Sequence, residues 1–316
     1  MGKTINKTSI GGQALIEGVM MKSPDYIASA IRTPGGEIVT SVRPLAKGKK
    51  KSIKNWPIIR GVFNFFDMMK LGYKELMNSA EIAGVDEEQT EPSKFEKWLS
   101  KTFKKDIMDI VMYIAVILGV ALALGLFVFL PTLIGGFFGV DNFWRTVVEA
   151  VLKVAIFIGY MAAVSLMPDM RRVFEYHGAE HKTISCFEAG EEVTPENAKK
   201  HCRFHPRCGT NFVTITILLS IVVFLAVSPL LDFLNLQNTL IRMLVKILLL
   251  PVVAGISYEL IKIAGKHENF ITKAISLPGM LMQRITTKEP DLSQLECATT
   301  AFLLALNGEE KKEDAK

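Results

Sequence analysis

Four long apolar segments stand out in the pattern of hydrophobic and polar positions along the chain. They run over Ile107–Leu130, Trp144–Met167, Phe212–Leu234 and Leu240–Ala264. A helix needs about 20 mostly apolar residues to cross a bilayer, so each segment is long enough for one membrane span. The second segment carries Glu149 and Lys153 four residues apart, a spacing that predicts an ion pair on one helix face. The fourth carries Arg242 and Lys246 at the same spacing.

Basic residues flank these segments on alternate sides. Lys and Arg precede the first segment, lie between the second and third, and follow the fourth, whereas the connections 131–143 and 232–239 contain none. Because basic flanks stay on the cytoplasmic side, both termini and the central loop are predicted to face the cytoplasm. The expected environment is the lipid bilayer of the plasma membrane. These flanks also account for the formal net charge of +5, and no nucleic-acid-binding motif accompanies them.

The first 45 residues predict a small β-rich unit. The runs YIASAIR and EIVTSV flank TPGG, which is a strong turn signal. Upstream, GGQALIEGVMM combines glycines with an apolar run that is broken by a single carboxylate, Glu17. Glu17 is either the exposed residue of a strand or a carboxylate that points into a site.

The remaining polar regions are predicted to be cytoplasmic as well. A basic amphipathic helix is expected over residues 47–78; it either lies among lipid headgroups or docks on the membrane-spanning helices. An acidic linker follows over residues 81–94. Near the C-terminus, Asp291 and Gln294 predict the capping box of a short apolar helix that is followed by a solvated tail.

The predicted fold is therefore that of a mainly α integral membrane protein with about four transmembrane helices and a small β-rich N-terminal subdomain. Its parts are a cytoplasmic N-terminal region (1–105), two spans (106–168), a cytoplasmic central loop (169–211), two further spans (212–265) and a C-terminal helix and tail (266–316).

The central loop contains the segment YHGAEHK, in which His177, Glu180 and His181 form the pattern H-x-x-E-H. On a continuous helix the two histidines lie one turn apart on the apolar face, where both imidazoles can reach one cation; Gly178 could also interrupt that helix. In the inverted zinc-protease motif, the histidines hold zinc and the glutamate accepts a proton from metal-bound water. The pattern predicts a metal site with Glu180 as catalytic base. The alternative is a pair of interfacial histidines that are hydrogen-bonded to backbone or headgroups.

A second polar cluster, HCRFHPRCGTN, follows in the same loop and contains His201, Cys202, His205 and Cys208. Four of the five histidines and three of the four cysteines of the chain fall within this loop. Disulfides are rare on the reducing cytoplasmic side, and thiolate and imidazole are the ligands that zinc prefers. The loop therefore predicts a divalent metal site, zinc above all, that is either open and catalytic or closed and structural. Glu259, near the cytoplasmic end of the fourth segment, is a further candidate ligand or pairs with Lys262.

Four ordered motifs, GGQALIEGVMM, YHGAEHK, HPRCGTNF and PGMLMQRITTKEPD, resemble the YqhQ-like bacterial membrane proteins. That family is a domain of unknown function, often labelled a predicted metal-dependent enzyme. The resemblance covers nearly the whole chain and implies that its motif residues matter here. They are Glu17, His177, Glu180, His181, His205 and Cys208, whereas His201 and Cys202 lie outside the motif core.

These observations lead to three functional hypotheses. The first is a metal-dependent hydrolase that acts at the membrane on a protein segment or a lipid. The second is a non-catalytic factor in membrane-protein biogenesis or quality control, associated with other membrane proteins or the translocation machinery, with a structural metal. The third is an ion transporter lined by the charged pairs, which four spans would form only as a homo-oligomer.

Overall fold

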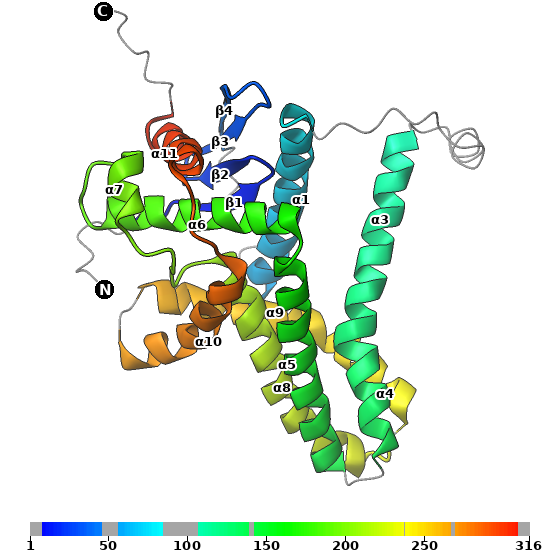
Figure 1. Cartoon of the computed structure of the whole chain (residues 1–316). Coiled ribbons are helices and arrows are strands. Elements are labelled where there is room, and N and C mark those ends of the chain that lie inside the picture. Colours follow the sequence, from blue (N-terminus) through cyan, green and yellow to red (C-terminus); the bar gives the residue numbers. More distant parts are fainter. Residues whose placement is uncertain are drawn as a thin grey trace, which may run out of the picture. The chain divides into compact units, whose positions relative to one another are not determined.

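The computed structural model describes residues 8–45, 56–84, 107–138, 142–236, 238–266 and 269–308 (Figure 1). The basic run at 47–54 and most of the acidic linker at 81–94 lie outside these residues. The chain divides into two compact units. The first comprises Met1–Val85, Tyr160–Leu218 and Pro251–Lys316, and the second comprises Asp86–Gly159 and Leu219–Leu250.

A four-stranded antiparallel sheet forms the centre of the first unit, which confirms the predicted β-rich N-terminus. Its strands are β1 (Gly11–Leu15), β2 (Gly18–Lys22), β3 (Tyr26–Arg32) and β4 (Ile38–Pro44), and they pair in sequence order. Gly36, in the TPGG turn, adopts a φ of 90°, which glycine tolerates without steric cost. Glu17 occupies the tight turn between β1 and β2 at a φ of 52° and is not a strand residue.

Helices cover both faces of this sheet. Successive side chains along each strand point to opposite faces, so each strand contributes to both cores. Val19 and Met21 pack with α6 (Pro168–Glu188), α7 (Pro195–Lys199) and α11 (Leu292–Asn307) in the larger core of the unit. Leu15 and Met20 face the other way and pack with α1 (Ile59–Ile82). The sheet thus lies between one helix and a layer of three helices (Figure 1).

Helix α1 is the predicted amphipathic helix, and its polar side packs against protein. Arg60 forms a two-pronged ion pair with Glu259, and Asn64 donates to the hydroxyl of Tyr258, both on α9 (Thr239–Lys266). Leu71 and Ile82 pack on the sheet, but other large apolar side chains of α1 are exposed, including Phe66 and Met69. The start of α1 is therefore docked on a membrane-spanning helix, which was one of the two predicted alternatives. The exposed apolar face of α1 remains available to lipid or to another protein.

Among the residues that the structure describes, four helical segments are long and apolar enough to cross a membrane: Ile114–Phe137, Phe143–Ser165, Gly209–Phe233 and Thr239–Ala264. The last three belong to α5 (Asn142–Ser165), α8 (Gly209–Phe233) and α9. The protein is therefore a membrane protein of the predicted class, mainly helical with a small N-terminal sheet.

The first span extends beyond its predicted end at Leu130. It consists of α3 (Ile107–Leu124), a π-helical stretch (Gly125–Phe129) and α4 (Leu130–Phe137). A proline inside an α-helix clashes with the preceding turn, but the wider π turn lies directly before Pro131 and accommodates its ring. The helix therefore continues seven residues beyond the predicted end of the span, to Phe137.

The central loop and the C-terminal region are largely helical. Helix α11 begins with the predicted capping box of Asp291 and Gln294. Between α9 and α11, the helix α10 (Phe270–Thr286) begins with a second capping box, Asn269 and Thr272. Gly279 of α10 lies against Asn211 at the start of α8, where a β-carbon would overlap the asparagine. Close packing of α10 thus fixes the beginning of α8 next to α6.

Candidate metal centre

Helix α6 carries the H-x-x-E-H residues and is continuous through Gly178. Pro168 occupies its first turn, and Gly190, with a φ of 79°, follows its end. Gly178 faces the backbone of Lys288, whose amide donates to the carbonyl of Phe174 at 2.8 Å. This glycine therefore permits a close approach of the chain after α10. It does not break the helix, so His177 and His181 lie one turn apart.

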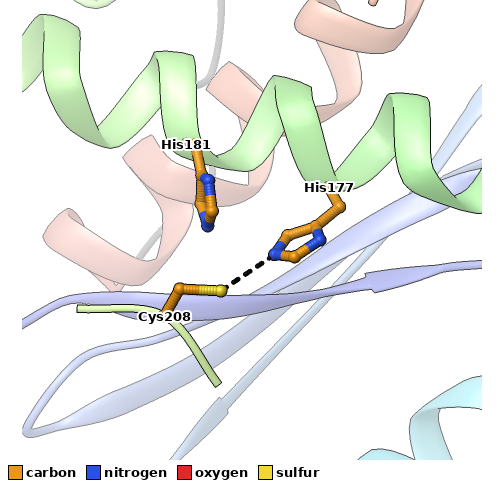
Figure 2. Close-up of side chains that lie close together, drawn as sticks. All are labelled: His177, His181 and Cys208. Carbon is orange, nitrogen blue, oxygen red and sulfur yellow. Dashed lines mark hydrogen bonds between the residues drawn. The ribbon is translucent and has the colours of Figure 1, made fainter. Parts of the chain in front are cut away.

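Cys208 lies opposite these two histidines, directly before α8 (Figure 2). Its Sγ lies 3.1 Å from Nε2 of His177. One ligand atom from each of His177, His181 and Cys208 lies within 4.8 Å of the others. Cys208 and His181 are buried, and His177 is partly buried. Two imidazoles and one thiol thus converge on a common point.

Backbone carbonyls fix the orientation of both rings. Nδ1 of His177 lies 2.8 Å from the carbonyl oxygen of Thr286, and Nδ1 of His181 lies 2.6 Å from that of Arg203. Each Nδ1 is therefore a donor, which leaves the lone pair on each Nε2 in the neutral ring. Nε2 of His181 is buried and has no hydrogen-bond partner among the described residues. Metal-binding histidines have this arrangement of an outer carbonyl and a free inner nitrogen.

The electrostatics of the group favour a thiolate at Cys208. Burial alone raises the pKa of this thiol, but the neighbouring His177 and His181 lower it more, to well below its usual range. The backbone amide of Thr210 also lies 3.3 Å from Sγ, at the start of α8, where a negative charge is favoured. Burial lowers the pKa of His177, yet the charge and hydrogen bond of Cys208 raise it to about 9.

Glu180 is buried beside this group and is anchored to the sheet. The backbone amide of Gly12 donates to its Oε1 at 3.0 Å. A β-carbon at Gly12 would lie only 2.6 Å from the carbonyl oxygen of Met20 and 3.0 Å from the Glu180 carboxyl carbon. Burial raises the pKa of Glu180, and the charges of His181 and His177 oppose that rise. The glycines of GGQALIEGVMM thus allow a strand to hold this carboxyl group.

The side chain of His205 lies next to the group but has another partner. Its Nε2 is 3.2 Å from Oε2 of Glu188, and its ring centroid is 5.8 Å from that of His181. Gln283 of α10 accepts from its amide and donates to its carbonyl, each at 2.8 Å. His205 therefore lies outside the three-residue group in this structure, and its role as a ligand stays a prediction.

Glu17 and Glu259 lie elsewhere and form ion pairs. Glu17 binds Arg172 of α6 through both carboxylate oxygens and accepts from the hydroxyl of Tyr176 at 3.1 Å. It therefore joins the β1–β2 turn to the helix that carries both histidines. Glu259 pairs with Arg60, as described above, rather than with Lys262.

Cys202 is exposed, whereas His201 belongs to a second group with Cys186 and Glu191. In that group, Nε2 of His201 lies 3.2 Å from Oε2 of Glu191. Burial and the charge of Glu191 raise the pKa of the Cys186 thiol. Since a metal binds the thiolate, the group with Cys208 is better suited to hold one.

Sequence reasoning missed Glu188, Gln283 and the carbonyl groups of Arg203 and Thr286. Backbone carbonyls leave no trace in a sequence, because every residue has one. Gln283 had a signal, its place within PGMLMQRITTKEPD, but nothing in that motif names His205 as its partner.

The fold and this group together define a polytopic α-helical membrane protein with a candidate metal centre of two histidines and one cysteine. The chain belongs to the family described as "Protein of unknown function (DUF1385)", whose model matches residues 56–307. It is similar to "Uncharacterized protein YqhQ" of Bacillus subtilis (strain 168), with 33% identity over 300 residues, 92% of this chain and 90% of that protein. The resemblance drawn from the four motifs is thereby confirmed. No solved structure shows a significant match to the chain.

Proposed function

We propose that this protein is a membrane-embedded, metal-dependent hydrolase whose metal is held by His177, His181 and Cys208. One observation carries the proposal: the inner nitrogens of two oriented imidazoles and a thiol with a lowered pKa converge in a buried site. Two imidazoles and a thiolate are a ligand set that suits zinc. Three protein ligands leave a fourth position for water, as in catalytic zinc sites.

Glu180 is the proposed general base. A bound zinc ion would lower the pKa of its water towards about 7. A general base works best when its pKa is near the working pH. Burial raises the pKa of the Glu180 carboxyl group and so moves it in that direction. The hydrogen bond from Gly12 holds one carboxylate oxygen in place, so that the side chain cannot turn freely. His205 and Glu188 are proposed to support the site from outside.

The proposed substrate is a segment of a membrane protein or a lipid headgroup. Cys208 lies directly before α8, which is itself a candidate membrane span, so the candidate centre is close in sequence to the point where the chain enters the bilayer. The basic flanks of the spans support the proposal that this side of the protein faces the cytoplasm of a bacterial cell.

Elemental analysis of the purified full-length protein tests the ligand set. We expect one zinc per chain in the native protein, and its loss in Cys208→Ser and in the double variant His177→Ala/His181→Ala. Cys202→Ser is the matched control, because it removes an exposed thiol and should keep the metal. A native protein without metal, purified without chelators, would contradict the proposal.

Glu180→Gln tests catalysis separately from metal binding. The amide keeps the shape of the side chain but cannot accept a proton, so we expect a protein with bound zinc and no activity. The measurement compares protein N-termini and membrane lipids in cells that make the native protein, the variant or neither. If cells with the variant have the same protein N-termini and lipids as cells with the native protein, and both differ from cells that lack the protein, hydrolysis is excluded.

That last outcome would favour the second candidate function, a non-catalytic factor in membrane-protein biogenesis with a structural metal. The exposed apolar face of α1 is the observation in its favour, because large side chains such as Phe66 and Met69 offer a surface to another membrane protein. Co-purification of a membrane partner that is lost in a Phe66→Ser/Met69→Ser variant would support it.

A further inference from the structure

A cluster of charged side chains is buried among the membrane-spanning helices of the second unit. Glu149 and Lys153 on α5 are 3% and 8% exposed, and Arg242 and Lys246 on α9 are 2% and 6% exposed. The side chain of Arg145, one turn before Glu149, is 11% exposed. Charge is costly inside a membrane protein and marks functional positions there by default.

Glu149, the carboxylate at the centre of this cluster, already forms ion pairs. Glu149 forms ion pairs with Lys246 and with Arg145, the latter at 3.2 Å, and lies 3.9 Å from Arg242. Lys153 does not complete the predicted pair with Glu149; its Nζ donates to the hydroxyl of Ser220 at 3.2 Å. One negative charge thus serves at least three basic groups.

Arg242 has donors that nothing in the described chain accepts. Its Nη2 donates to Thr146 at 2.9 Å, but its Nε and Nη1 are buried without a hydrogen-bond partner. The next carboxylate, Asp232 on α8, is close enough to act on Arg242 electrostatically. Its Oδ1 is buried and also lacks a partner among the described residues. Counting both acids, the four basic side chains leave an excess of two positive charges.

Two small cavities lie within this charged cluster, and Arg242 lines one of them. Glu149, Lys153 and Lys246 line the first cavity, and Arg242, Lys246 and Ser228 line the second. Phe224 of α8 borders both, and Nζ of Lys153 and of Lys246 lie 5.1 and 5.6 Å from its ring centroid. Lys246 borders both cavities, and in the second it lies beside Arg242, whose Nε and Nη1 lack acceptors among the described residues.

Lys153 lies too deep in the span for its ammonium group to reach the bilayer surface. It lies ten residues after Phe143, where the span begins. At a rise of about 1.5 Å per residue this is about 15 Å, half the thickness of a hydrocarbon core of about 30 Å. A buried cation at this depth needs a negative partner, and Glu149 supplies too little charge.

We propose that this cluster binds a small inorganic anion, such as chloride, beside Arg242 and Lys246, which both line the second cavity. An anion would accept from the free donors of Arg242 and neutralise part of the excess charge. The cavities are too small for a lipid phosphate with its glycerol group, which is why a small ion is the better fit. The site belongs to a different unit from the candidate metal centre and does not depend on hydrolysis.

Binding of radioactive chloride to the purified full-length protein in detergent tests this proposal. We expect saturable binding with a stoichiometry of one, competition by bromide and no competition by gluconate. Chloride should also raise the thermal unfolding midpoint of the native protein at constant ionic strength, a readout that needs no variant. Absence of saturable binding to the native protein would overturn the proposal.

Three variants with opposite expectations separate a binding site from a structural ion network. Arg242→Gln and Lys246→Gln should weaken chloride binding by about tenfold or more, because each removes a charged donor that lines the second cavity. Glu149→Gln should strengthen it, because it removes the competing negative charge. Lys273→Gln, on the exposed side of α10, is the matched control and should bind like the native protein.

Two results would contradict the assignment of the ion. If Glu149→Gln, folded by gel filtration, weakens binding as much as Arg242→Gln, the cluster is structural. If native mass spectrometry finds an anionic lipid that is lost in Arg242→Gln and that blocks chloride, the site belongs to a lipid headgroup.

Discussion

The contact between Gly12 and Glu180 joins two motifs that are 168 residues apart in the sequence. The strand can come this close only because Gly12 has no side chain, since a β-carbon would press on Met20 and on the carboxyl group itself. Gly11, the neighbouring residue in the same motif, has open space where its β-carbon would be. Two adjacent glycines of one motif therefore have different roles.

Gly12→Ala should lower stability by about 1–3 kcal/mol, the usual cost of overpacking a tight contact. It should also reduce the metal content, because Glu180 and the helix that carries it have to shift. The measurement is the thermal unfolding midpoint of the purified protein together with its zinc content. Gly11→Ala is the control, and an equal effect of both changes would refute this account.

At the same scale, spacing along a helix was enough to bring His177 and His181 together. It was not enough for Cys208, which lies 27 residues after His181 and reaches the site through contacts between distant parts of the chain, such as that of Gly279 in α10 with Asn211. His205 lies close to Cys208 in the sequence, yet its imidazole faces Glu188 in this structure, and its role as a ligand stays a prediction. The partners of Glu17 and Glu259 lie 155 and 199 residues away, and no local pattern identifies them.

At the scale of elements, α6 depends on a glycine that helix propensity alone disfavours. Gly178 lies in the middle of the helix, where alanine is normally more stable by about 1 kcal/mol. Here a β-carbon would overlap the carbonyl oxygen of Lys288. The chain that follows α10 would move away, and with it the carbonyl of Thr286 that orients His177.

Gly178→Ala should therefore destabilise the protein despite its better helix propensity, by about 1–3 kcal/mol, and should lower metal affinity. Gly159→Ala, in helix α5, has nothing within 4 Å of its β-carbon and should be neutral or slightly stabilising. Thermal unfolding and zinc titration of both variants decide the matter. A stabilised Gly178→Ala protein would show that the contact with Lys288 is not important.

Elements with a clear hydrophobic pattern, a turn signal or a capping motif could be predicted from the sequence. The four apolar segments, the β-hairpins and the capping box of α11 follow from local sequence. The first span extends past Pro131 because a π turn relieves the proline, and such a turn has no signature in the apolar pattern. Helix α10 was not predicted; it contains Pro278 and Gly279, which are normally unfavourable inside a helix, and here Gly279 allows close packing on Asn211.

At the scale of the whole molecule, three distant parts of the chain build the unit that contains the candidate metal centre. Strands from the N-terminus, α6 from the middle and α11 from the C-terminus share one apolar core. Phe302 of α11 is fully buried in that core, in contact with Phe187 of α6 at a centroid distance of 5.1 Å. The C-terminal helix is thus part of the core and offers little of its apolar surface for docking.

Phe302→Ala should cost about 3–5 kcal/mol, as expected for the loss of a buried aromatic ring. It should loosen α6 and reduce the zinc content, while the membrane spans remain inserted. Phe270→Ala is the control, because this side chain is 86% exposed. Limited proteolysis and zinc analysis in detergent test both. Native zinc content and protease resistance in Phe302→Ala would argue against a shared core.

The shared core also sets an order of events during synthesis. The ribosome makes the sheet first and the helix that covers it last, with 247 residues between Pro44 and Leu292. At about 5–20 residues per second this gap lasts about 10–50 s. Throughout that time the newborn sheet has one apolar face without its final cover, while the spans are already entering the bilayer. The cell must shield that face, so a stalled or shortened chain becomes a target for chaperones and proteases.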